Sequence, residues 1–169
     1  MSISNLPDTA RIWTFGASRP LENAQVQALD LGISGFLSSW AAHGSPLRAG
    51  HAILDDTFLV VAVDDDSQGA SGCSIDALVR HLRDLEEQLD VSVLDGARIW
   101  YRTHAGDIVS CDRAQFRTRA EKGDVDDATP VFDTTIQTLS ELRSGRFERP
   151  LADSWHVRLT TPMSTTGSD

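Results

Sequence analysis

The sequence of 169 residues predicts an α+β fold with a ferredoxin-like β-α-β-β-α-β core, in which helices cover one face of an antiparallel sheet. Two observations predict it. Short runs of β-branched and aromatic residues alternate with two long amphipathic stretches, and two of the runs are joined by a very short turn. We expect one domain over residues 10–159, between flexible termini at 1–9 and 160–169.

A strand and a long helix open the predicted core. Residues 10–15 are rich in Ile, Trp and Phe, which favour extended structure. Residues 22–42 carry apolar side chains at steps of three and four, as one face of a helix does. These side chains are Val26, Leu29, Ile33, Phe36, Leu37 and Trp40. Gly32 and Gly35 weaken this helix and indicate a kink or a close packing contact.

A hairpin, a second helix and a fourth strand complete the core. Strands at 51–54 and 57–63 flank Asp55-Asp56, a pair that favours a tight turn. The stretch 74–89 has one apolar stripe and predicts a helix, and a strand at 97–103 follows it. After the core, the sequence predicts a strand at 107–111, a short helix at 113–120, a last helix at 132–143 and a strand at 155–159.

The charge of the chain argues against one class of partner. Acidic residues outnumber basic ones 25 to 15, so the formal charge is −10 and the pI is about 4.8. Phosphates repel such a chain, and a nucleic-acid partner is not expected, although residues 98–102 resemble a base-stacking face. Nineteen of the acids are Asp, and Lys122 is the only lysine. This bias favours adaptation of the surface to high salt, with a GC-rich genome as the alternative.

The composition also indicates where in the cell the protein is expected. The longest strongly apolar run, 58–63, is far too short to cross a membrane, so no membrane association is expected. Residues 1–10 have neither a basic start nor an apolar stretch, and a signal peptide is not expected. Cys73 and Cys111 lie far apart, which predicts free thiols and a cytoplasmic protein. The sequence does not indicate an oligomeric state.

The most informative stretch is a small-residue turn that runs into the second helix. It contains Gly69, Ser71, Gly72, Ser74 and Asp76. The backbone N–H groups and the dipole of a helix N-terminus favour a bound anion. We therefore predict that these residues bind a small anion or a protein partner. The alternative is structural: Ser71, Ser74 and Asp76 cap the helix, and the glycines permit the turn.

Cys73, in the same turn, supports a second hypothesis, a thiol-dependent enzyme. A helix N-terminus favours the thiolate form of a cysteine, which is its nucleophilic form. His43, at the predicted end of the first helix, is the candidate base, with His51 and His104 as rivals and His81 and His156 as less favourable choices. The alternatives are that Cys73 is a small buried residue and that His43 only complements the end of a helix.

Several motifs with known chemistry are absent from the sequence. The phosphate-binding loop of ATPases needs a lysine after its second glycine, and Lys122 is wrongly placed, so the chain is not a P-loop ATPase. No dinucleotide fingerprint, no Cys-x-x-Cys and no histidine pair at ligand spacing occurs, so no cofactor and no metal site is predicted. The segment 69–73 ends in Cys where the serine-hydrolase elbow has Gly.

Three short segments resemble a family of small bacterial proteins. They are Arg19-Pro20-Leu21, the Ala42-His43-Gly44 that follows Trp40, and Ser71-Gly72-Cys73-Ser74-Ile75-Asp76. Trp155 fits the same pattern, and the resemblance covers residues 11–159. The family is of Bacteroidetes type with salt-loving relatives, and some members carry the label "ABC transporter ATPase" without a Walker motif. The resemblance implies a grouping and no mechanism, and it directs attention to His43, Cys73 and Asp76.

Three functional hypotheses follow from the sequence. The first is a cytoplasmic, non-catalytic ligand-binding or protein-interaction module centred on residues 69–76. The second is a thiol-dependent enzyme with Cys73 as nucleophile and a histidine base. The third is a structural subunit of a larger assembly.

Overall fold

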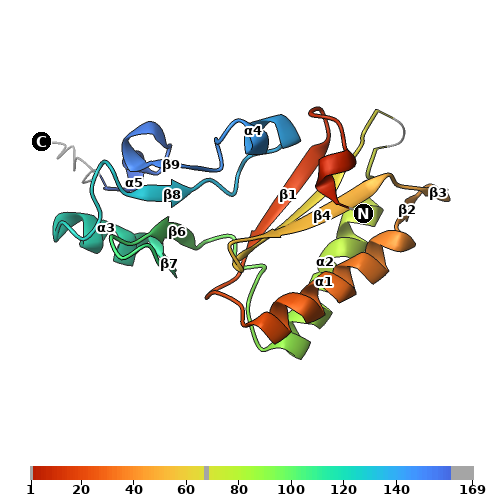
Figure 1. The fold of residues 1–169 in the computed structure, drawn as a ribbon, viewed down its shortest axis with the longest axis horizontal. Coiled ribbons are helices and arrows are strands. Elements are labelled where there is room, and N and C mark those ends of the chain that lie inside the picture. Colours follow the sequence, from red (N-terminus) through yellow and green to blue (C-terminus); the bar gives the residue numbers. More distant parts are fainter. Residues whose placement is uncertain (1, 67–68, 161–169) are drawn as a thin grey trace, which may run out of the picture. The chain divides into compact units, whose positions relative to one another are not determined.

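The computed structural model describes residues 2–66 and 69–160 and shows an α+β fold with antiparallel sheets (Figure 1). The contacts divide the chain into two compact units. Unit 1 comprises residues 1–96 and 133–147, and unit 2 comprises residues 97–132 and 148–169. Each unit has its own sheet and its own cluster of buried side chains. The single domain expected over residues 10–159 stays a prediction.

Unit 1 is built on a three-stranded antiparallel sheet with the order β1-β5-β4. Its strands are β1 (Arg11–Gly16), β4 (Ala49–Leu54) and β5 (Phe58–Val63). The predicted hairpin is confirmed, since β4 pairs with β5 across the turn at Asp55-Asp56. All six residues of β5 are buried. A central strand that is covered on both faces requires an uninterrupted apolar sequence, and Phe58–Val63 supplies it.

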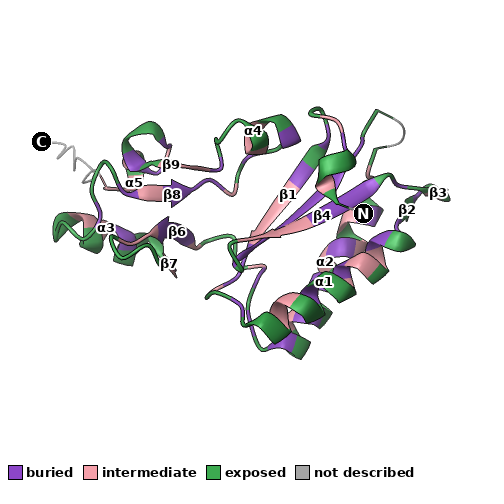
Figure 2. Cartoon of the chain, viewed as in Figure 1, coloured by how far each residue is buried: buried purple, intermediate pink, exposed green. Residues whose placement is uncertain are grey.

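Helices α1 (Asn23–Ser38) and α2 (Gly72–Leu89) pack against one face of this sheet. Each helix has a buried side and an exposed side (Figure 2). The buried residues on these helices are Leu29, Ile33, Leu37, Leu78, Leu82, Leu85 and Leu89, and they join Leu59, Val61 and Val63 of β5 in one cluster. A Cβ at Gly32 would lie 2.7 Å from Leu85 Cδ2, so the predicted close packing contact is confirmed.

The opposite face of the sheet is covered by residues that are distant in sequence. Phe58 of β5 meets Phe147 edge-to-face, with ring centroids 5.0 Å apart. Helix α4 (Leu139–Arg143) precedes Phe147, and the Arg143 guanidinium donates to the backbone carbonyls of Ile3 and Leu6. Within the terminus predicted to be flexible, residues 1–9, Ile3–Asn5 forms a 3-10 turn that is bonded to Arg143 of α4. Residues 161–169 of the other predicted terminus lie outside the described residues.

The predicted ferredoxin-like order is not confirmed. Elements β1, α1, β4, β5 and α2 follow the expected β-α-β-β-α sequence, but the next strand, β6 (Ile99–Arg102), pairs with β7 and β8 in another sheet. The edge of β1 away from β5, here called the outer edge, is instead bonded to the segment before α4. Ile12 N–H donates to Gln137 O at 2.9 Å, and Leu139 N–H donates to Ala10 O at 2.9 Å.

Unit 2 has a four-stranded antiparallel sheet with the order β7-β6-β8-β9. Its other strands are β7 (Ile108–Cys111), β8 (Pro130–Phe132) and β9 (Glu148–Pro150). Helix α3 (Arg113–Glu121) matches its prediction and begins at the capping box of Asp112 and Gln115. The core of unit 2 contains Ile99, Tyr101, Cys111, Phe116, Val125, Val131 and Leu151.

The helix predicted over residues 22–42 is too long at its C-terminal end. It ends at Ser38, and the chain then forms a small hairpin of β2 (Ala41–Ala42) and β3 (Ser45–Pro46). The turn between them is His43-Gly44, with φ of 50° and 81°. Two consecutive left-handed residues form the tight turn that suits the twist of a hairpin. The apolar spacing up to Trp40 did not reveal this turn.

At the C-terminal end, the predicted last helix is present but shorter than expected, and the predicted last strand is wrong. The helix predicted at 132–143 is only α4, because the Asp133 carboxylate accepts from Thr135 N–H and makes a turn there. The helix starts only after Thr138, whose side chain caps Glu141 N–H. The strand predicted at 155–159 is the short helix α5 (Val157–Thr160), which packs on unit 2. In the described part of the chain, no helix is both long and apolar enough to cross a membrane.

Candidate functional site

The predicted binding turn begins α2, and its two serines have structural roles. Ser71 is the N-cap, and its Oγ accepts from Ser74 N–H at 3.3 Å. Ser74 is buried, and its hydroxyl donates to Ser71 O at 2.8 Å. The indole N–H of Trp40 donates to Ser74 O at 2.9 Å. These bonds explain both serines as parts of the helix cap and of the contact with Trp40.

The remaining residues of the turn are exposed. Gly69, Gly72, Cys73 and Asp76 all face solvent. Gly72 and Cys73 belong to the first turn of α2, which starts two residues earlier than the predicted helix over residues 74–89. Anion binding at residues 69–76 stays a prediction.

The structure does not join Cys73 to a histidine. His43 lies on the β2–β3 turn and is exposed, and among residues 2–66 and 69–160 no hydrogen bond or ion pair links it to Cys73. The other four histidines have different partners, which are Asp30 for His51, Gly32 O for His81, Asp126 for His104 and Ser154 for His156. The thiol-enzyme hypothesis stays a prediction.

The two cysteines should differ strongly in reactivity. Cys73 is exposed, whereas Cys111 is buried, and this burial raises the pKa of the Cys111 thiol. We expect an aromatic disulfide reagent at pH 8 to label one thiol quickly and the second only after unfolding. Cys73→Ser should abolish the fast phase, and Cys111→Ser should leave it unchanged. Two fast thiols in the folded wild type would contradict the burial of Cys111.

A groove along the outer edge of β1 has more features of a binding site than the turn at residues 69–76 has. It encloses about 220 Å³ and is lined by Arg11, Ile12, Trp13, Thr14, Phe15 and Thr134, Thr135, Ile136, Gln137. Two segments far apart in sequence therefore form its walls, and both belong to unit 1. By contrast, a hollow of about 460 Å³ in unit 2 lies along one side of α3 and the turn after it, without a facing wall.

The backbone of β1 leaves polar groups open in this groove. Because Ile12 N–H bonds to Gln137, even-numbered residues of β1 direct their N–H and C=O toward the outer edge, and odd-numbered ones direct theirs toward β5. The antiparallel bridge there pairs Arg11 with Thr138 and brings Ile12 N–H to Gln137 O, but the segment before Gln137 does not continue the ladder to Thr14. Within the described residues, the N–H and C=O of Thr14 therefore have no strand partner on that edge.

The Thr14 side chain is a second unsatisfied group at the same place. Its Oγ1 is buried and has no hydrogen-bond partner among the described residues. Buried hydroxyls in native proteins are almost always bonded, and an exception calls for an explanation such as a ligand or a bound water. Thr14 also lines the groove, where its open backbone N–H and C=O are the groups available to an occupant.

Arg11 and Trp13 also line the groove, and they lie on the face of β1 opposite to the face of Ile12 and Thr14. The guanidinium carbon of Arg11 lies 4.7 Å from the centroid of the Trp13 ring. Trp13 in turn packs edge-to-face on Trp40, with centroids 6.3 Å apart. This stacking orients the Arg11 side chain and leaves its N–H donors available.

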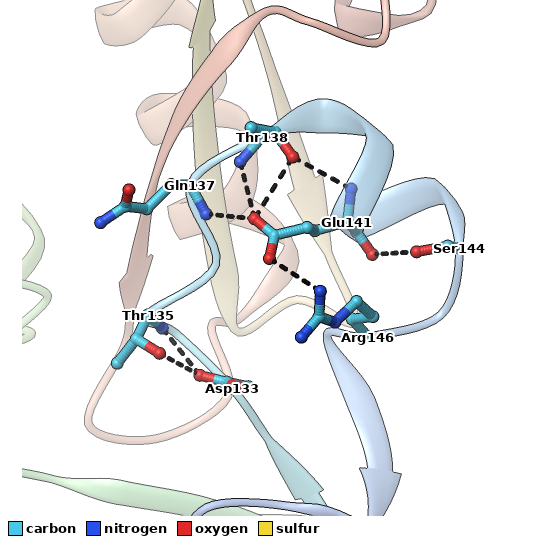
Figure 3. Close-up of polar contacts among 7 residues, drawn as sticks. All are labelled: Asp133, Thr135, Gln137, Thr138, Glu141, Ser144 and Arg146. Atoms are coloured by element: carbon cyan, nitrogen blue, oxygen red, sulfur yellow. Dashed lines mark hydrogen bonds and ion pairs between the residues drawn. The ribbon is translucent and has the colours of Figure 1, made fainter.

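Glu141 holds the facing wall in place (Figure 3). Its carboxylate accepts from Gln137 N–H at 2.9 Å, from Thr138 N–H at 3.2 Å and from Thr138 Oγ1 at 3.2 Å. Its other oxygen lies 3.3 Å from Arg146 Nη1. The Gln137 amide, with smaller contributions from Thr138 and Arg146, lowers the pKa of Glu141. The carboxylate thereby fixes Gln137, whose carbonyl receives Ile12 N–H.

The residues of this groove were not identified from the sequence. Residues 10–15 were predicted only as a strand, and 134–137 only as part of a helix. The one available signal was Arg11 beside Trp13 and Thr14, which does not show that β1 lies at an edge. Comparisons with protein-family models, curated proteins and solved structures found no match. The resemblance to the Bacteroidetes-type family therefore stays a prediction.

Proposed function

We propose that the chain is a non-catalytic protein-interaction module that binds an extended peptide segment of a partner along the outer edge of β1. The observation that carries the proposal is the open N–H and C=O of Thr14, next to a ladder that Gln137 has already started. A strand with unpaired backbone groups is a template for strand addition, in which main-chain hydrogen bonds supply affinity.

The groove fits such a segment better than it fits a compact ligand. Its β1 wall is Arg11–Phe15, and beyond Ile12, which is bonded to Gln137, no described residue bonds the outer edge of this wall. Its facing wall has Thr134, Thr135 and Gln137 beside Ile136, so a peptide backbone would meet polar side chains there. We also propose that the protein works in the cytoplasm, since both cysteines are free thiols.

Peptide titration of two variants at Thr14 tests the proposal. The probe is a pool of nine-residue synthetic peptides of Thr, Ser, Val and Ile with one Gln at a random position. Thr14→Pro removes the outward N–H and leaves the β1–β5 hydrogen bonds intact, because position 14 donates nothing to β5. Thr14→Val keeps the N–H, removes the unsatisfied hydroxyl and should be at least as stable as wild type.

We expect wild type and Thr14→Val to bind the pool, with a shift and slowed hydrogen exchange of the residue-14 amide, and Thr14→Pro to lose binding. If Thr14→Pro does not fold, slowed exchange of the Thr14 amide in wild type decides alone. Equal binding by Thr14→Pro and Thr14→Val, or no effect of peptide on the Thr14 amide, would refute strand addition at this edge.

A further inference from the structure

We infer that the segment bound along β1 carries an acidic side chain, which Arg11 recognises. This inference rests on the proposed strand addition and specifies the chemistry of the partner. Among the described residues that line the groove, Arg11 is the only charged one. A charged group at the edge of a binding groove selects partners of opposite charge and repels those of like charge.

Arg11 differs from several other arginines of unit 1 in having no carboxylate partner. Arg48 pairs with Asp64 at 2.8 Å, Arg143 pairs with Asp8, and Arg146 pairs with Glu141. In the part of the chain that the structure describes, Arg11 makes no ion pair, although acidic residues outnumber basic ones by 16 to 7 in unit 1. A cation left unpaired in so acidic a unit is available to a carboxylate from outside.

The side chain of Arg11 is also oriented for this role. Its contact with the Trp13 ring restricts the guanidinium, so less side-chain entropy is lost on binding. Residues 11, 13 and 15 share one face of β1, and residues 12 and 14 share the other. In an added strand, side chains alternate in the same way, so the acidic residue would be on the Arg11 face. The Thr14 face would receive small or polar residues.

Charge-reversal titration of the full chain tests the inference. Two more nine-residue pools are made, identical to the neutral pool except that Glu or Lys replaces the single Gln. We expect wild type to bind the Glu pool about tenfold more tightly than the Lys pool, since attraction and repulsion both contribute. Arg11→Glu should reverse this order. Arg19→Glu, the same charge change at an exposed arginine outside the groove, should leave it unchanged.

The outcomes separate this inference from the proposed function. Equal affinity of wild type for the Glu, Gln and Lys pools, with binding still lost in Thr14→Pro, would refute the role of Arg11 and leave strand addition standing. A reversed preference in Arg19→Glu as well as in Arg11→Glu would show that net charge alone decides, and would also refute it. No binding of any pool to wild type would remove the proposed function and this inference together.

Discussion

Leu82→Ala should destabilise unit 1 by about 2–5 kcal/mol, the range for removing a fully buried leucine side chain. Leu82 is completely buried on α2, in the cluster that joins both long helices to β5. Phe116→Ala should destabilise unit 2 by about 3–5 kcal/mol, since Phe116 is equally buried and contacts the Tyr101 ring edge-to-face at 5.7 Å. Chemical denaturation measures both losses.

Amide hydrogen exchange of the same two variants shows whether the units open separately. Because Leu82 and Phe116 lie in different clusters of buried residues, we expect Leu82→Ala to speed exchange mainly in β5 and α2, and Phe116→Ala mainly in β6 and α3. Leu31→Ala, at an exposed leucine of α1, is the matched control and should change neither unit by more than about 0.5 kcal/mol. If both core variants accelerate exchange equally in both units, the chain unfolds as one domain, as the sequence predicts.

The sequence predicted the elements that have a clear local period. The stripes at every third or fourth residue gave α2 within two residues of its start and gave the beginning of α1. The apolar run at 58–63 gave β5, and Asp55-Asp56 gave the hairpin turn. In each case the pattern lies within one segment, and it reflects the burial of that segment against the rest of unit 1.

Elements whose ends depend on distant contacts were not predicted. Apolar spacing continues through Trp40, yet α1 ends at Ser38, and the Trp40 indole instead bonds to Ser74 O, 34 residues further along. The strand β6 has an ordinary strand sequence, and nothing in its residues shows that it pairs with β7 and β8. Which sheet a strand joins is decided by tertiary contacts, and local propensity does not report them.

The candidate site shows the same division. Ser71, Ser74 and the glycines were singled out because a helix start is visible in sequence, and the structure gives Ser71 and Ser74 capping roles. The β1 groove depends on the contact of Ile12 with Gln137, which are 125 positions apart. A strand edge is open when no other segment pairs with it, and the residues of the strand itself do not show whether another segment will pair.

Replacing Glu141 should weaken the wall of the groove and make its stability depend on pH. Glu141→Ala removes the acceptor for the N–H groups of Gln137 and Thr138, and we expect a loss of about 1–3 kcal/mol at pH 7. Glu141→Gln keeps an acceptor oxygen and should lose less, because glutamine also serves in a capping box. Glu87→Ala, at an exposed glutamate of α2, controls for the loss of a surface charge.

The sign of the pH dependence follows from the lowered pKa of Glu141, caused first by the Gln137 N–H. A carboxyl whose folded pKa is lowered adds stability above its unfolded value of about 4.3, and this contribution is lost as the pH falls through the folded pKa. The difference between wild type and Glu141→Gln should therefore be largest near pH 7 and shrink below about pH 4. A difference that grows on acidification would contradict the assignment.

Glu141→Ala also tests whether peptide binding depends on the stability of the facing wall. When Glu141 no longer holds Gln137, the Ile12 amide should exchange faster, while Trp13 and Phe15, which bond to β5, should keep their protection. A strand added at Thr14 would then no longer lie next to an ordered hydrogen bond between Ile12 and Gln137. We expect Glu141→Ala to weaken binding of the peptide pools even though Glu141 does not line the groove. Unchanged affinity together with faster Ile12 exchange would show that the added strand needs no support from Gln137.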